Sequence, residues 1–135
     1  MSLKEQINSM DMDDIVAMCV HQEQQAIELY TLAKNQAKDE RSRQKFQELI
    51  DMETAHKLAL QNFEIEHYID LPPADLKVTD YLMEPTLSDN MTTQEIIILA
   101  AKREAKTATM YQDLALQFAA EKELHTFFQM MADEE

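Results

Sequence analysis

The chain of 135 residues contains no glycine and only three prolines. Glycine is the usual residue for turns that need a positive φ, so a fold built from many tight β-hairpins is excluded. Alanine, leucine, glutamate, glutamine, lysine and methionine are plentiful instead, and all of them favour helix. The composition therefore predicts an all-α protein with long helices.

Cysteine is nearly absent as well, since Cys19 is the only one. A single cysteine excludes an intrachain disulfide framework. It also excludes a Cys-x-x-Cys pair for zinc, rubredoxin-type iron or dithiol chemistry. We therefore interpret Cys19 as a small apolar side chain in the core.

Positive charge is scarce, because 12 lysines and arginines stand against 26 aspartates and glutamates, a formal net charge of −14. Nucleic acid and anionic membrane surfaces attract basic patches, so neither is an expected partner. No apolar run approaches the roughly 20 residues that a transmembrane helix needs. The polar, acidic segment Met1–Asp14 does not resemble a signal peptide, and we expect a cytoplasmic protein.

Helical periodicity divides the chain into four segments within one expected domain, 1–135. The four predicted helices span 13–37, 40–66, 92–119 and 121 to the end of the sequence. Asp39 is the predicted N-cap of the second helix, while Thr92 and Glu95 have the spacing of a capping box. Residues 67–91 hold all three prolines and are predicted to form one long irregular crossover.

Each predicted helix carries an apolar stripe at helical spacing. The stripes are Ile15, Cys19, Ala26, Ile27, Tyr30 and Ala33; Phe46, Leu49, Ile50, Leu60 and Phe63; Ile97, Ala100, Ala101, Leu114 and Phe118; and Leu124, Phe127, Met130 and Met131. Glutamates interrupt all four stripes, at Glu23, Glu53, Glu104 and Glu134. Glutamates on a solvated face would not recur at core positions of every helix.

These glutamates belong to an internal repeat with an offset of 81 positions. Glu23 corresponds to Glu104, Tyr30 to Tyr111 and Glu53 to Glu134. Residues equidistant from a hairpin turn lie side by side. Glu23 and Glu53 are each 15 positions from residue 38, and Glu104 and Glu134 are each 15 from Ala119. Each hairpin is therefore predicted to present a facing pair of carboxylates.

The chemistry follows from the cost of burying carboxylates. Four of them in an apolar interior repel one another and lose hydration, and divalent cations remove both penalties. Glu53 and His56 are three residues apart on one helical face and can ligate the same ion. Mixed carboxylate and imidazole ligation suits iron or manganese, with zinc as a possible substitute. Calcium would not explain the histidine, and magnesium usually retains more water.

The segments that carry this pattern resemble the rubrerythrin-like proteins of the ferritin-like di-iron carboxylate superfamily. The segments are 23–30, 51–56, 103–111 and 131–135, and the resemblance covers about residues 11–135. It implies a ferritin-like four-helix bundle made of two helical hairpins joined by the long crossover. It also implies two iron ions as the cofactor.

By the same resemblance, Glu23 and Glu104 would be terminal ligands, one for each metal. Glu53 and Glu134 would bridge both metals, and His56 would bind the first. No catalytic residue is expected beyond these ligands. Tyr30 and Tyr111 are interpreted as core tyrosines whose hydroxyls bond a ligand carboxylate across the bundle.

The chain departs from the family pattern in three places. It has no rubredoxin-like cysteine domain, so electrons would come from an external donor protein. Ala101 stands where rubrerythrins often have a further glutamate, which weakens the transfer of peroxidase chemistry. The partner of His56 would fall at position 137, after Glu135, so we expect that the fourth helix is truncated and that the natural protein continues.

Two function classes remain open from the sequence. The first is a di-iron oxidoreductase in oxidative stress or iron metabolism, which reduces peroxide or dioxygen or oxidises ferrous iron. The alternative is a protein that binds or stores iron or another divalent metal without turnover. A homodimer or higher homo-oligomer is expected in either case.

Overall fold

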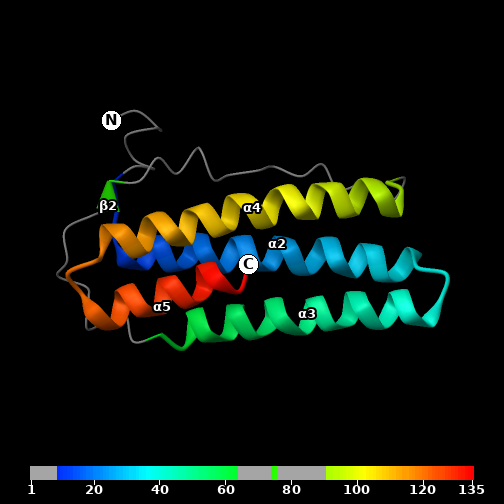
Figure 1. Ribbon diagram of the computed structural model, residues 1–135, viewed down its shortest axis with the longest axis horizontal. Helices are drawn as coiled ribbons and strands as arrows, with labels where there is room; N and C mark the ends of the chain where they lie inside the picture. The colour runs from blue at the N-terminus through cyan, green and yellow to red at the C-terminus, as the bar shows by residue number, and fades with distance from the viewer. Residues whose placement is uncertain (1–8, 64–73, 76–90) are drawn as a thin grey trace. The chain divides into compact units, whose positions relative to one another are not determined.

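The computed structural model describes residues 9–63, 74–75 and 91–135. Four helices account for most of them (Figure 1): α2 (Met12–Gln36), α3 (Glu40–Gln61), α4 (Thr93–Gln117) and α5 (Lys122–Asp133). Two short strands, β1 (Ser9–Met10) and β2 (Ala74–Asp75), pair antiparallel. The prediction of a helical protein with four helices is confirmed, and the architecture is compatible with a four-helix bundle.

The predicted caps are confirmed where α3 and α4 begin. The Asp39 carboxylate accepts hydrogen bonds from Ser42 N at 2.8 Å and Ser42 Oγ at 2.9 Å. Glu95 N donates to Thr92 Oγ1 at 3.1 Å, and Thr92 N donates to Glu95 Oε1 at 3.3 Å. These bonds satisfy backbone N–H groups that have no partner within the helix, which is why both helices start at these positions.

The helix ends differ from the prediction in two places. Helix α3 stops at Gln61, where Asn62 is the C-cap, rather than continuing to residue 66. Helix α5 stops at Asp133, with Glu134 as its C-cap. Residues 64–66 lie outside the described part of the chain, as does the predicted crossover 67–91 except for Ala74, Asp75 and Met91.

The described residues fall into two compact units. The first, called here the α3 unit, comprises 17–63 and 91–103, and so contains most of α2, all of α3 and the first part of α4. The second, called the α5 unit, comprises 9–16, 74–75 and 104–135. The single domain over 1–135 stays a prediction, and each unit is described by itself.

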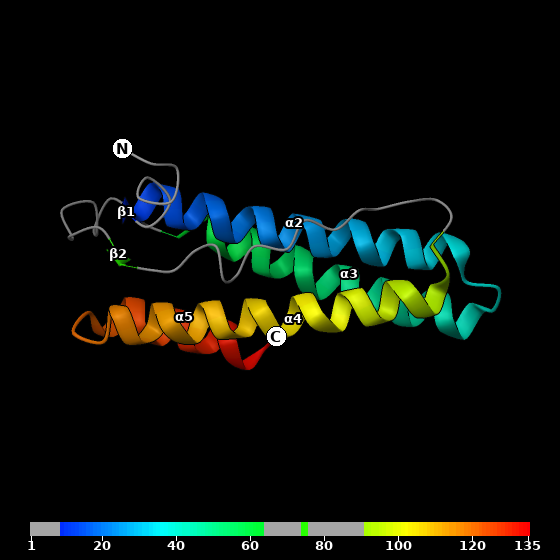
Figure 2. The ribbon, with the colours of Figure 1, turned by 90° about the horizontal axis from the view of Figure 1, so that it is seen from above.

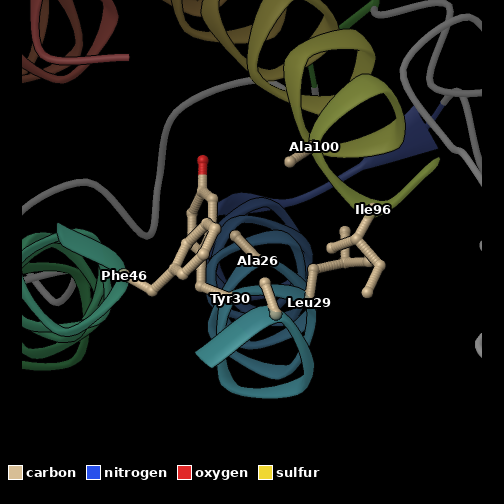
Figure 3. Packing of buried hydrophobic residues seen from close by; sticks show 7 residues of the cluster. Ala26, Leu29, Tyr30, Phe46, Ile96 and Ala100 are labelled. Atoms are coloured by element: carbon tan, nitrogen blue, oxygen red, sulfur yellow. The ribbon is translucent and has the colours of Figure 1, made fainter. Parts of the chain in front are cut away.

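The α3 unit has a core to which three helices contribute (Figure 3). Its buried residues are Ala26, Leu29, Tyr30 and Ala33 from α2, Phe46 from α3, and Ile96 and Ala100 from α4. Polar side chains join the helix ends around this core. The Gln36 side chain donates to Met91 O at 2.6 Å and accepts from Thr93 Oγ1 at 3.4 Å. Arg43 Nη1 donates to Ala37 O at 3.0 Å, just after the end of α2.

In the α5 unit, α5 lies along the second part of α4 (Figures 1 and 2). The buried Phe128 ring stacks on Tyr111 and on Phe118, with centroid separations of 6.3 and 6.2 Å. His125 Nδ1 donates to Ala115 O at 2.6 Å. That carbonyl lies in the last turn of α4, where backbone acceptors lack helical partners, so the histidine caps α4 from α5.

Several apolar positions predicted for the stripes lie elsewhere. Ile97 is 50% exposed and Met130 is 45% exposed, whereas Ile96 and Phe128 are buried in the core. Ala101 is exposed as well. Each helical residue turns the side chain by about 100°, so a stripe read one or two positions off selects the wrong face. Cys19 is fully buried, as predicted.

Candidate metal centre

Glu53 and His56 lie on the same face of α3, three residues apart. Both side chains are shielded from solvent, with exposed fractions of 0% for Glu53 and 3% for His56. The helix continues beyond both residues to Gln61, so regular helical geometry fixes their relative positions. The prediction that they share one face is confirmed.

Glu23 on α2 meets this pair from the neighbouring helix. His56 Nδ1 lies 3.5 Å from Glu23 Oε2 and 3.6 Å from Glu53 Oε2. One ligand atom from each of the three residues lies within 4.8 Å of the others. The equal distance of Glu23 and Glu53 from the turn at residue 38 accounts for this meeting, because the two helices form an antiparallel hairpin (Figure 1).

The three side chains fit a divalent transition metal. Carboxylate oxygens and an imidazole nitrogen bind such ions at about 2.0–2.2 Å, so atoms on opposite sides of an ion are up to roughly 4.4 Å apart. The ligand atoms of the three residues lie within 4.8 Å of one another, which is close to that limit. Glu23 is 1% exposed and Glu53 is 0% exposed, so little water can reach these carboxylates. A bound cation would stabilise their negative charge where hydration does not. A buried Glu/His cluster that could hold a metal ion is therefore present.

A second group of buried polar residues lies beside Glu23 along α2. Arg103 is 3% exposed, and its Nη2 donates to Gln22 Oε1 at 3.1 Å and also to Gln25 Oε1. Gln22, directly before Glu23, is 4% exposed. Gln22 and Arg103 are separated by 81 positions, so equivalent positions of the sequence repeat contact each other.

The sequence reasoning missed Arg103 and Gln22. The only available signal was their place in the repeat, where each immediately precedes a glutamate proposed as a ligand. Charged side chains are usually exposed, and long polar ones often are, so neither residue would be assigned to a core from the sequence alone.

The second set of predicted ligands has a different environment. Glu104, on α4, is half-buried, and Glu134, the C-cap of α5, is exposed. Neither belongs to a candidate group of three or more metal-ligating side chains among the described residues. The assignments of Glu104 as a terminal ligand and of Glu134 as a bridging ligand stay predictions.

The two tyrosines of the repeat are both buried, with exposed fractions of 7% for Tyr30 and 0% for Tyr111. Tyr30 belongs to the apolar core of the α3 unit (Figure 3), and Tyr111 stacks on Phe128 in the α5 unit. Their interpretation as core tyrosines is confirmed. The bond from either hydroxyl to a ligand carboxylate stays a prediction.

Comparison of the chain with protein-family models, curated proteins and solved structures gives no match. Within the described residues, no helix is both long and apolar enough to cross a membrane. Function is therefore inferred from the buried cluster and from the sequence repeat.

Proposed function

We propose that this chain is a di-iron carboxylate protein of the rubrerythrin-like, ferritin-like type and that it acts as an oxidoreductase. The observation that carries the proposal is the meeting of Glu23, Glu53 and His56, all three of them buried. Their three ligand atoms would hold the first metal. The repeat supplies Glu104 as the terminal ligand proposed for the second metal, and Glu53 and Glu134 are the ligands proposed to bridge both.

Iron is the proposed metal because its chemistry matches this donor set. Carboxylate and imidazole ligands suit ferrous iron and manganese, and zinc accepts the same atoms. Structural zinc sites are usually built with cysteine, and the single cysteine, Cys19, is not in the cluster. Manganese and zinc remain substitutes that could occupy the same ligands.

Bound iron would supply one-electron redox chemistry for reducing peroxide or dioxygen, or for oxidising ferrous iron. The chain itself would hold the metal through Glu23, Glu53 and His56 and keep bulk water away by burying all three. Because Cys19 is the only cysteine, the chain offers no rubredoxin-type site to deliver electrons. We therefore propose an external electron-donor protein, and a homodimer or higher homo-oligomer as the functional form.

A protein that holds metal without turnover is the second candidate. The different environments of the two ligand sets favour it, because Glu134 is exposed and neither Glu104 nor Glu134 belongs to a candidate group of metal-ligating side chains among the described residues. A single firmly held ion would be enough for binding or buffering, whereas the proposed oxidoreductase needs both ions.

Turnover separates the two candidates. Metal-free protein would be loaded anaerobically with Fe(II), and peroxide consumption would be followed with an excess of a chemical reductant. An oxidoreductase consumes many equivalents per chain, whereas a binding protein consumes no more than its bound iron can reduce. The matched variant Glu53→Gln removes a ligand charge without changing side-chain size. Turnover equal to that of wild type in this variant would contradict the proposal.

A further inference from the structure

Arg103 is the only residue with a permanent positive charge among the buried residues of the part of the chain that is described. The buried carboxylates in that part are Glu23 and Glu53. All three residues belong to the α3 unit. With neutral His56, the buried charges therefore add up to one negative charge before any metal binds.

The bond from Arg103 to Gln22 places the guanidinium beside the residue that directly precedes Glu23 in α2. Arg103 Nη2 is 3.1 Å from Gln22 Oε1, and Gln22 is directly followed by Glu23. Side-chain reach and the 3.8 Å spacing of neighbouring Cα atoms limit the distance from guanidinium to Glu23 carboxylate to about 16 Å. At an effective dielectric constant near 20, a unit charge at that distance changes ion binding measurably.

We propose that Arg103 is an internal counter-charge that positions and tunes the Glu23–Glu53–His56 cluster, a role that rests on the proposed metal binding. It offsets part of the carboxylate charge in the metal-free protein, which helps α2 and α3 to keep the cluster assembled. It also repels an incoming cation, so the site binds divalent metal less tightly than its ligands alone would. If the metal is iron, Arg103 favours the ferrous over the ferric state.

The hydrogen bonds of Arg103 give it a second effect on the cluster. Its guanidinium donates to Gln22 and Gln25, which lie on either side of Glu23 in α2. These contacts hold the α2 segment that carries the ligand against the first part of α4. The two effects can be separated by experiment. Lysine at position 103 keeps the positive charge but loses much of the hydrogen bonding that positions α2.

The test measures Zn(II) affinity by chelator competition, together with the melting temperature of the metal-free protein. Arg103→Gln should bind Zn(II) about tenfold more tightly than wild type, although its metal-free form should melt at a lower temperature. Arg103→Lys should keep an affinity near that of wild type. Arg41→Gln is the matched control, because it removes one positive charge from an exposed position on α3.

The repeat offers a further control. The double change Gln22→Arg with Arg103→Gln exchanges two residues that contact each other, and should leave Zn(II) affinity within about twofold of wild type. A purely structural arginine would give Arg103→Gln an unchanged or weaker affinity, and that result would overturn the proposal. An equal gain in Zn(II) affinity in Arg41→Gln would also overturn the proposal.

A metal-free experiment separates this proposal from failure of the proposed function. In the double-mutant cycle of Arg103→Gln and Glu53→Gln, the arginine change should lower the melting temperature less when Glu53 is already neutral. This coupling requires no metal and no activity. If the two changes lower the melting temperature additively, the proposed role of Arg103 as a counter-charge is wrong, even in a protein that binds metal well.

Discussion

The two copies of the glutamate repeat have equal spacing in the sequence but different surroundings in the structure. In the first copy, Glu23 and Glu53 are buried together with His56, and their ligand atoms converge. In the second, Glu104 is half-buried and Glu134 is exposed. Equal spacing along the chain therefore goes with unequal burial at these positions.

The two carboxylates also differ in their positions relative to their helices. Helix α3 continues for two turns after Glu53, so this carboxylate occupies a regular helical position on the buried face. Helix α5 ends at Asp133, which leaves Glu134 at the C-cap.

The largest expected effect is on the affinity for the first metal, when one glutamate is changed in each copy in turn. Glu53→Gln should weaken binding of the first metal by more than about 100-fold, because changes to groups that only support ligands already cost up to that much. Glu104→Gln, which changes the terminal ligand proposed for the second metal, should change the same affinity by less than about threefold. Isothermal titration with Mn(II) would measure both. Equal losses in the two variants would show that the first copy is not a separate site.

Metal should stabilise the protein through the first copy. A ligand bound only by the native state adds about 2.7 kcal/mol at a hundredfold excess over Kd, or roughly a 10 °C rise in Tm for a domain of this size. Melting of verified metal-free protein with and without Mn(II) would measure this shift. Glu53→Gln is the control, and it should lose most of the rise. No rise in wild type would contradict the metal site.

The second copy should determine how many ions the chain binds, and should not change the affinity for the first ion. If Glu104 and Glu134 are the ligands proposed for a second iron, wild type should bind two equivalents of anaerobic Fe(II) per chain. Glu104→Gln should then leave one. Metal analysis after desalting would count them. A single equivalent in wild type would restrict the site to the first copy and favour the binding protein over the oxidoreductase.

The smallest expected effects concern the caps that start α3 and α5. Asp39 caps α3 through Ser42, whereas Glu121, at the start of α5, makes no side-chain cap bond. Glu121→Ser should stabilise the protein by about 0.5–1 kcal/mol, since serine is a favoured N-cap. Asp39→Ala should lower the melting temperature. Urea unfolding of both variants would test the contrast, and destabilisation by Glu121→Ser would contradict it.

The Asp39 cap also predicts a dependence on pH. Hydrogen bonds from the backbone and side chain of Ser42 hold the pKa of the Asp39 carboxyl below its ordinary value of 3.8. A lowered folded-state pKa adds stability above the ordinary value, and this stability is lost as the pH falls through the folded pKa. Asp39→Asn keeps a cap without the titration. The stability difference between wild type and this variant should therefore shrink in acid, and an unchanged difference would count against the cap.

Much of the fold and half of the candidate site could be predicted from the sequence. The four helices, the Asp39 cap and the capping box follow from local chemistry, and Glu53 with His56 follows from helical spacing. Hairpin symmetry was sufficient to add Glu23. How deeply Arg103 is buried depends on packing between distant segments, which spacing does not encode. Periodicity failed for the same reason at Ile97 and Met130.

The most direct test of the account is metal binding by wild type and by the variant in which Glu23, Glu53 and His56 are all changed to glutamine. Both metal-free proteins would be titrated anaerobically with Fe(II), desalted and analysed for bound iron, with circular dichroism as the check that both are helical. Wild type should hold at least one tightly bound ion per chain, and the folded variant should hold none. Equal iron in the two folded proteins would contradict it.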